Sequence, residues 1–300
     1  MLGVAEQTLA AEKSVDIIIC IHNALEDVEL CLASVLASLK ERHRIILVND
    51  DSDLETSAFL CKAAEEYSSK ISLLRTSEQL FFTKSANLGL AKSDAEVAIL
   101  LNSDTIVPGN WVEKLVHLLF LDPAMGIVGP LSNAANLQSI PSIEHSGTNT
   151  AINRLPKDTS LEEMNVLCET WSRESDIPLV PNVHGFCFCI KRGVREKLGY
   201  LDELSFPQGY GEETDYSYRA MDAGYRLAVA TDTYVYHSKS RSYLQADRKR
   251  LMDVSMAALR KKYPSRIEWA NRLLRAHPLL GEMRDKAQKF YQMAQDKNST

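Results

Sequence analysis

Three polar residues, Asn102, Ser103 and Asp104, directly follow an apolar run at residues 98–101. Such a run predicts a strand buried inside a parallel sheet, with the polar residues at its carboxyl end. Ligands of open α/β sheets bind outside the carboxyl ends of the strands. A carboxylate held there has the chemistry to bind a hard divalent cation against a diphosphate. The trio alone is weak evidence, so its meaning depends on what else the fold brings to that edge.

Polar turns follow two earlier strands as well. One comes after an apolar run at residues 15–21, and the other, at residues 49–53, comes after a run at 44–48. The carboxyl ends of parallel strands meet at one edge of a sheet. We therefore expect both turns to share a crevice with Asp104.

The second turn contains two acids that invite different interpretations. Asp50 lies inside the turn, where its carboxylate could accept the N3–H of a uracil or thymine ring, a charge-assisted hydrogen bond that specifies the base. Asp and Ser residues that follow a strand also cap the next helix. We favour ligand binding for Asp50 and helix capping for Asp53 or Ser52.

Lys84 and Asn87 are three residues apart and share one face of a predicted helix at residues 84–91. A lysine and an amide near a helix amino terminus can contact phosphate or base edges. A solvated lysine beside a locally capping Asn87 explains the pattern equally well, so both interpretations stay open.

The strongest single motif is an acidic cluster, in which Glu212, Glu213 and Asp215 open a helix just after Gly209 and Gly211. Acids in a first turn are favoured by the helix dipole, which is the structural interpretation. Paired carboxylates beside a glycine-rich turn also suit a general base, because each raises the pKa of its neighbour.

Two histidines are candidates for the same crevice. His237 ends a predicted strand at residues 226–236, where metal binding and an ordinary structural role are about equally expected. His184, next to Gly185, has a weaker case for contact with a substrate.

Strands alternate with helices through residue 129, which predicts an α/β fold with a mainly parallel, Rossmann-like sheet flanked by helices. Residues 131–181 interrupt this rhythm and are rich in Ser, Asn, Thr and Pro, with one short helix expected at 161–171. A long irregular insertion in a compact domain is usually functional. We divide the chain into an N-terminal tail (1–13), an α/β domain (14–240) and a C-terminal helical extension (241–300).

The composition is that of a globular protein, with 45% hydrophobic and 25% charged residues. No apolar run approaches the roughly 20 residues that cross a bilayer, and residues 1–13 do not resemble a secretory signal. The six cysteines form no Cys-x-x-Cys pair. Cys187 and Cys189 alternate with phenylalanine, which suits strand packing better than metal binding. We expect a cytoplasmic protein with reduced thiols.

Charge is distributed unevenly between the two main parts. Residues 241–300 contain 14 Lys and Arg against 6 Asp and Glu, a net charge of +8, and the chain as a whole carries −6, so residues 1–240 carry −14. The basic helices are expected to present solvated faces. The alternative is peripheral contact of Arg248–Arg250 and Arg260–Lys262 with an anionic membrane surface.

The strand-end motifs and the acidic cluster occur in one order: residues 21–23, 48–52, 102–104 and 211–215. Over residues 14–240 this ordered set resembles the family 2 inverting glycosyltransferases with the GT-A fold. The resemblance implies a nucleotide-sugar donor and a divalent cation, Mn²⁺ or Mg²⁺.

The same resemblance implies a role for each matched residue. The base and ribose would contact the nucleotide-binding set, which is Ile21, His22, Asn23, Asp50, Asn102 and Ser103, together with the candidates Lys84 and Asn87. Asp104 and His237 would hold the metal. The acidic pair at the helix start, Glu213 with Asp215, would supply the catalytic base, and His184, Gly185 and Glu212 would meet the acceptor.

The sequence departs from the commonest family pattern at three positions. Asn49 and Asn102 stand where acids are usual, which leaves base binding to Asp50 and makes Asp104 the one sure carboxylate ligand. Glu213 stands where Asp is frequent, and its longer side chain shifts the carboxylate by about one methylene, which local geometry can absorb.

The predicted activity is inverting transfer of a sugar from a UDP- or dTDP-linked donor to a hydroxyl of a glycan or lipid-linked acceptor, in surface polysaccharide synthesis and without nucleic acid. A sugar-phosphate nucleotidyltransferase would need a basic, glycine-rich loop after the first strand, and residues 22–26 are neither. An Asp-dependent phosphotransferase leaves residues 211–215 unexplained. A non-catalytic nucleotide-binding scaffold is disfavoured by the presence of Asp104 and Glu213 together.

Overall fold

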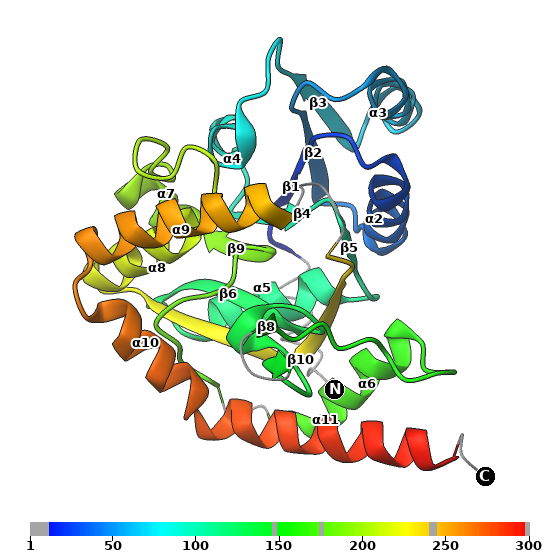
Figure 1. Cartoon of the computed structure of the whole chain (residues 1–300). Coiled ribbons are helices and arrows are strands. Elements are labelled where there is room, and N and C mark those ends of the chain that lie inside the picture. The colour runs from blue at the N-terminus through cyan, green and yellow to red at the C-terminus, as the bar shows by residue number, and fades with distance from the viewer. Residues whose placement is uncertain (1–11, 146–148, 174–176, 240–244, 298–300) are drawn as a thin grey trace.

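The computed structural model of the chain describes residues 12–145, 149–173, 177–239 and 245–297. Its centre is a mainly parallel sheet of eight strands in the order β3-β2-β1-β4-β9-β6-β10-β5 (Figure 1). These strands are β1 (Val15–Ile21), β2 (His43–Asn49), β3 (Ile71–Arg75), β4 (Val97–Asn102), β5 (Thr105–Ile106), β6 (Met125–Ser132), β9 (Cys187–Lys191) and β10 (Arg226–His237). The predicted α/β architecture is confirmed.

The strand pairing explains why the polar turns converge. In the parallel pairs of β1 with β2 and β4, Ile21 lies opposite Asn49, and Cys20 lies opposite Asn102. Strand β9 runs antiparallel to β4, with Cys187 opposite Leu101. The residues just before β9 therefore lie at the carboxyl end of β4, although they enter the strand rather than leave it.

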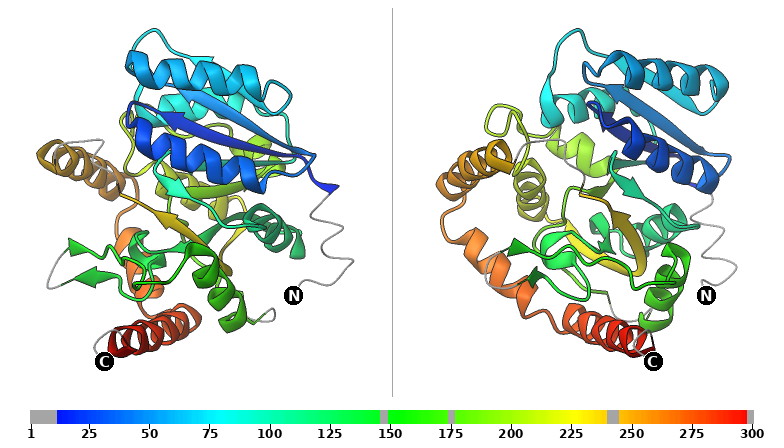
Figure 2. Two further views of the ribbon diagram at one scale, coloured as in Figure 1. Left: turned by 90° about the vertical axis from the view of Figure 1, so that its right-hand side faces the viewer. Right: turned by 45° about the vertical axis from the view of Figure 1, so that its right-hand side comes forward.

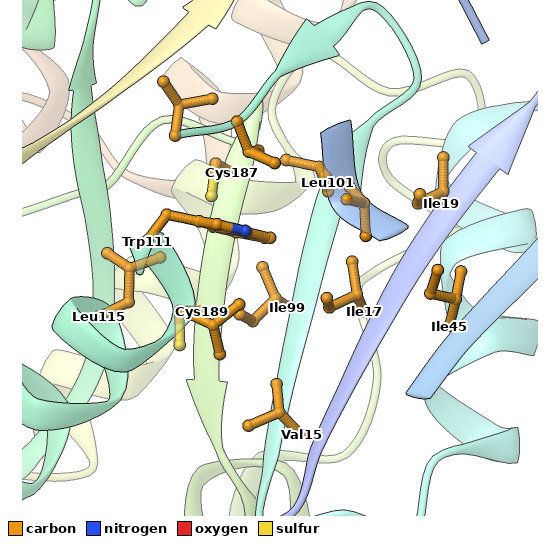
Figure 3. Close-up of a cluster of buried hydrophobic side chains, with 14 of the residues drawn as sticks. Val15, Ile17, Ile19, Ile45, Ile99, Leu101, Trp111, Leu115, Cys187 and Cys189 are labelled. Carbon is orange, nitrogen blue, oxygen red and sulfur yellow. The ribbon is translucent and has the colours of Figure 1, made fainter. Parts of the chain in front are cut away.

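Helices cover both faces of the sheet and enclose two hydrophobic cores. The first core includes α2 (Leu25–Ser38), α3 (Leu54–Glu66) and α5 (Trp111–Leu121), and the second includes α4 (Phe81–Lys92), α6 (Leu161–Trp171), α7 (Arg192–Leu198) and α8 (Glu212–Asp222). Ile17 and Ile19 pack into the first core and Ile18 into the second, as the alternation of a strand requires. Figure 3 shows part of the first core around Trp111. Cys187 and Cys189 are buried there as free thiols, which confirms their predicted packing role.

The insertion at 131–181 contains little regular structure. Besides α6 it forms the short 3-10 helix η1 (Asn136–Gln138) and the two-stranded ladder of β7 (Glu144–His145) and β8 (Asn149–Thr150). The predicted helix at 161–171 is confirmed, and it begins in a reciprocal capping box formed by Ser160 and Glu163.

Three helices form the C-terminal extension, namely α9 (Gln245–Lys262), α10 (Arg266–Arg275) and α11 (Pro278–Lys297). They run in succession along one side of the sheet domain, as the orange and red ribbons show (Figures 1 and 2). Pro264 lies between α9 and α10. No helix in the described ranges is long and apolar enough to span a membrane.

Some basic residues of the extension pair with the acidic domain, whereas Arg260, Lys261 and Arg272 are exposed, as the expectation of solvated helix faces requires. Lys262 Nζ lies 2.9 Å from Asp202, and Arg266 lies 2.9 Å from Asp222. Lys286 donates to the Trp171 carbonyl oxygen over 2.8 Å. Part of the charge asymmetry of the sequence is therefore an internal complementarity. Residues 240–244 and the side chains of Arg248 and Lys249 lie outside the described part.

Candidate active site

The loops after β1 and β2 are fastened together by hydrogen bonds. The Asn23 N–H donates to Ser52 Oγ over 3.0 Å, and Asn23 Oδ1 accepts the Asp53 N–H over 2.7 Å. His22 Nδ1 lies 2.7 Å from the Asp50 carbonyl oxygen. Asn23 adopts a left-handed backbone with φ of 61°, which turns the chain sharply at the end of β1. His22 and Asn23 thus form one wall with the Asp50 loop, with Ile21 buried beneath it.

Asp50 is buried at the base of these two loops, with 3% of its surface exposed. Its Oδ1 accepts the Leu80 N–H over 2.7 Å and the Thr76 hydroxyl over 3.3 Å. Within the described part of the chain, Oδ2 has no hydrogen-bond donor. An oriented carboxylate with one open oxygen can accept a single N–H from a ligand.

The neighbours of Asp50 serve the backbone. Asp53 accepts the Thr56 N–H over 2.8 Å and caps α3, which confirms the predicted cap. Asn49 accepts the Ser52 N–H over 3.1 Å and donates to Ser57 Oγ over 3.0 Å. An amide at position 49 can do both, whereas a carboxylate could only accept.

Asp104 and His237 meet just beyond the carboxyl end of β4. The register between β5 and β10 sets His237 opposite Thr105, and His237 Nε2 lies 3.1 Å from Asp104 Oδ1. Asn102 Nδ2 lies 3.5 Å from the same ring nitrogen, and Ser103 is partly exposed beside it. The four residues predicted to hold the metal and the ribose side are therefore together.

The surroundings of His237 fix both its orientation and its tautomer. Its Nδ1 lies 3.0 Å from the Ala134 carbonyl oxygen, so Nδ1 carries a proton and donates it there. Its ring stacks on Phe186 with centroids 5.3 Å apart and an interplanar angle of 13°. Asn133 holds the backbone, because its Oδ1 accepts the His237 N–H over 2.7 Å.

This arrangement fits a divalent cation. With Nδ1 protonated, the lone pair of Nε2 faces a carboxylate oxygen, a contact that needs a proton or a metal between the two groups. No cluster of three or more His, Cys, Asp or Glu ligands occurs in the described ranges. Two protein ligands suit a cation that completes its shell with water and substrate phosphate oxygens.

Glu213 lies in the first turn of α8, against the segment that leads into β9. A Cβ atom at Gly185 would lie 3.2 Å from Glu213 Cγ, so the glycine permits the close approach of the two segments. Glu213 Oε1 accepts the Thr214 hydroxyl over 3.4 Å. The ring of His184, next to Gly185, lies 6.4 Å from that of His237. His184 and Gly185 thus connect the predicted base to the predicted metal ligand.

Burial raises the pKa of Glu213 above the ordinary glutamate value, although the Lys239 ammonium opposes the rise. The neighbouring Glu212 has its pKa raised to about 8, first by burial and then by the Glu213 carboxylate. Glu213 is partly exposed, whereas Glu212 is 4% exposed. Of the two, Glu213 is therefore the carboxylate that can meet a substrate.

Three predicted contacts receive a structural role instead. Glu212 Oε2 accepts the Gly211 N–H over 2.9 Å, so it closes its own turn rather than facing an acceptor. Asp215 is fully buried and accepts from Arg219 Nε over 2.8 Å and from the Tyr263 hydroxyl over 2.7 Å, which removes it from the catalytic pair.

The third is Asn87, whose side chain binds the loop before α8. Its Oδ1 accepts the Leu201 N–H, and its Nδ2 donates to Glu203, each over 3.0 Å. These bonds use both ends of the amide and leave no free edge for a nucleotide. Lys84 is exposed on α4, and its predicted contact with a nucleotide stays a prediction.

The sequence-based interpretation missed three residues that support the site: Asn133, Gln138 and Phe186. Gln138 Oε1 accepts the His184 N–H over 2.6 Å, and its amide donates to the Pro130 carbonyl oxygen over 3.0 Å. Asn133 follows β6, as the other polar residues follow their strands. The predicted strand stopped at residue 129, before Pro130, whereas β6 continues to Ser132. If the strand had been predicted to end at Ser132, Asn133 would have been placed with the other polar residues at the carboxyl edge of the sheet.

Comparison with known proteins agrees with this geometry. A model of glycosyl transferase family 2 matches residues 16–198. An uncharacterized glycosyltransferase of Haemophilus influenzae is 27% identical over 105 residues, which make up 35% of this chain and 32% of that protein. The aligned stretch thus spans about a third of the relative.

Two solved structures share the fold. The mannosyltransferase PcManGT from Pyrobaculum calidifontis, in complex with GDP-Man and Mn²⁺, superposes with a TM-score of 0.62 at 17% identity, covering 94% of this chain and 76% of its own. GalNAc-T7 with UDP, GalNAc and Mn²⁺ gives 0.61 at 15% identity, covering 95% and 56%. The GT-A fold predicted from the motifs is confirmed. Since the family model matches more than half of the chain, this protein belongs to glycosyl transferase family 2.

Proposed function

We propose that this protein is an inverting glycosyltransferase that moves a sugar from a UDP- or dTDP-linked donor to a hydroxyl group of a glycan or lipid-linked acceptor. The observation that carries the proposal is the meeting, at one sheet edge, of an Asp104–His237 pair and a carboxylate of raised pKa, Glu213. His184 and Gly185 lie between the two: the His184 ring is 6.4 Å from that of His237, and Gly185 packs against Glu213.

The nucleotide would lie against the β1 and β2 loops. The open Oδ2 of Asp50 suits the N3–H of uracil or thymine, because the rigid hydrogen bonds to Oδ1 fix its direction. His22 and Asn23 would form the wall beside the base, and Asn102 and Ser103 would face the ribose.

Asp104 and His237 would hold Mn²⁺ or Mg²⁺. When bound, such a cation neutralises the charge of a departing diphosphate. The protonated Nδ1 of His237, fixed by the Ala134 carbonyl, keeps Nε2 directed at Asp104. Phe186 stacks on the ring, and Asn133 holds the His237 backbone.

Glu213 would act as the base. Its carboxylate accepts the proton of the acceptor hydroxyl while that oxygen forms a bond to the anomeric carbon. The bond from this carbon to the phosphate oxygen breaks, and the nucleoside diphosphate leaves with the electron pair. A raised pKa suits this step, because a stronger base takes the proton more readily near neutral pH.

The acceptor would lie over the insertion at 131–181, since variable segments of a scaffold usually carry specificity. A role in surface polysaccharide synthesis in the cytoplasm is part of the same proposal. The pairing of Lys262 and Arg266 with acids of the α/β domain favours packing of the basic helices on that domain over their contact with a membrane. Flotation with anionic vesicles tests this, because a lipid-bound chain rises with them.

Calorimetric titration with UDP, dTDP, GDP and CMP, each with and without Mn²⁺, tests the proposal. We expect UDP or dTDP to bind with Mn²⁺, and Asp104→Ala to weaken that binding about 100-fold. Tight binding of GDP or CMP alone would reject the assigned donor. Absence of any nucleotide binding would reject the transferase proposal in favour of a scaffold.

A further inference from the structure

We infer that helix α9 positions the catalytic carboxylate, with Ser255 and Lys262 as positioning residues that act through the turn at 207–211 and through Asp215. This inference rests on the proposed role of Glu213. Helix α9 lies beyond residues 16–198, which the family model covers.

The turn that leads into α8 has an unusual backbone. Gly209 and Tyr210 both adopt positive φ angles, 93° and 67°. Such a conformation is costly for a residue with a side chain and persists only where the surroundings hold it. The turn ends at Gly211, one residue before the Glu212–Glu213 pair, so its path sets where α8 begins.

Helix α9 holds this turn at two points. Ser255 is buried in the apolar face of α9 between Leu251 and Leu259, and its hydroxyl donates to the Gly209 carbonyl oxygen over 2.9 Å. Leu259 packs so closely on the turn that a Cβ atom at Gly211 would lie 3.1 Å from its Cδ1. This hydrogen bond to the turn explains why a polar residue, Ser255, stands at the centre of the buried face of α9.

Residues at the end of α9 contact helix α8 itself. Lys262 Nζ lies 2.5 Å from Asp215 Oδ1, and the Tyr263 hydroxyl donates to the same oxygen over 2.7 Å. Asp215 follows Glu213 by two residues on the first turn of α8. The contacts from α9 and Tyr263 therefore reach the chain on both sides of Glu213, at the Gly209 carbonyl and at the Asp215 side chain.

On its other side Glu213 packs against Gly185, where an added Cβ atom would lie only 3.2 Å from Glu213 Cγ. The carboxylate is thus set by two surfaces: the β9 approach, which belongs to the sheet, and α8, which α9 fixes. A small displacement of a reacting group can cost on the order of 100-fold in rate. Loss of the α9 contacts should therefore lower turnover without touching the nucleotide loops.

The test compares Ser255→Ala and Lys262→Met with Lys286→Met in the full chain. Lys286 also joins the extension to the domain, through the Trp171 carbonyl oxygen, but on α11 and away from α8. Hydrolysis of UDP-glucose and dTDP-glucose with Mn²⁺ gives kcat and KM, and hydrogen exchange of the peptide at 207–213 reports on the turn.

For Ser255→Ala we expect kcat to fall about tenfold with KM for the donor unchanged, and amide exchange at 207–213 to quicken about fivefold, as loss of one hydrogen bond predicts. Lys262→Met should lower kcat in the same way. Lys286→Met should change neither quantity. In a Glu213→Gln background, Ser255→Ala should lower the residual rate no further, because both changes act on one group.

Equal exchange rates in Ser255→Ala and Lys286→Met would overturn the inference, and so would a loss of donor affinity with kcat unchanged. If neither donor is hydrolysed, exchange alone decides whether α9 holds the turn. The proposed function fails separately, when Glu213→Gln turns over donor as fast as the unmodified chain while the exchange result stands.

Discussion

The acids of this protein fall into two regions with opposite electrostatic surroundings. In the crevice, none of the ion pairs in the described part of the chain includes Asp50, Glu212 or Glu213. On the face covered by α9 and α10, Asp202, Asp215 and Asp222 each pair with Lys or Arg of the extension. The contrast is sharpest on α8, where Glu213 and Asp215 are only two residues apart.

The pKa directions follow this division. Burial without a paired cation raises the pKa of Glu212 to about 8, and that of Glu213 in the same direction. The Lys262 ammonium and two hydrogen bonds from Ser205 lower the pKa of Asp202, against a desolvation that would raise it. Burial alone therefore does not decide what a carboxylate can do. A cation at contact distance makes it a structural anchor, and the lack of one leaves it a base.

The largest effect should come from Glu213→Gln, which keeps the shape of the site and removes the proposed base. We expect turnover to fall about 1,000-fold, within the range of general base catalysis, with nucleotide binding unchanged. In the unmodified chain, the rate should rise with pH as Glu213 loses its proton, and the inflection should lie above the ordinary glutamate value because its pKa is raised. Initial rates from pH 5 to 9 measure this. A flat profile would contradict the assignment.

The matching change on the paired side is Asp215→Asn, which should affect stability first. Removing the buried charge leaves Arg219 and Lys262 without their shared partner, and both are partly exposed to water, so we expect a loss of about 2 kcal/mol in the free energy of unfolding. Urea denaturation of this variant beside Glu213→Gln measures the difference. Equal stabilities would remove the distinction between the two acids.

Glu212→Gln should act in the opposite direction and depend on pH. The folded state holds the Glu212 proton more tightly than the unfolded chain, so wild-type stability falls as pH rises from about 4.5 to about 8. A glutamine has no proton to lose. The variant should match wild type near pH 4 and exceed it by about 2 kcal/mol near pH 8. Denaturation at both pH values tests the sign, and an unchanged difference would contradict the raised pKa.

The smallest effect should come from Asp222→Asn at the far end of α8. Asp222 is 61% exposed in its ion pair with Arg266, so water and salt screen the attraction. We expect a change below about 0.5 kcal/mol, measured by the same denaturation. A loss as large as that for Asp215→Asn would mean that burial does not separate the two pairs.

Local sequence signals predicted most of the fold and part of the site. Apolar runs located the strands, and the short helix expected at 161–171 is α6. The polar residues after β1, β2 and β4 correctly marked one edge of the sheet. These features depend on near neighbours in the chain, so a single sequence carries them.

The roles of Glu212, Asp215 and Asn87 could not be predicted in the same way. All three are polar residues close to the motifs, and spacing alone does not distinguish one that faces a crevice from one that faces a distant helix. Asp215 binds Tyr263, which is 48 positions away, and Asn87 binds Leu201, which is 114 positions away.

The sequence by itself determined the residue types, the alternation of strands and helices and the opposite charges of the two parts. Only the tertiary structure decided which acids are neutralised, because pairing depends on which surfaces meet when the chain folds. The Coulomb energy of a pair falls off with distance and grows where water is excluded. The packing of α9 against α8 therefore separates Asp215 from Glu213, although the sequence presents them as one cluster.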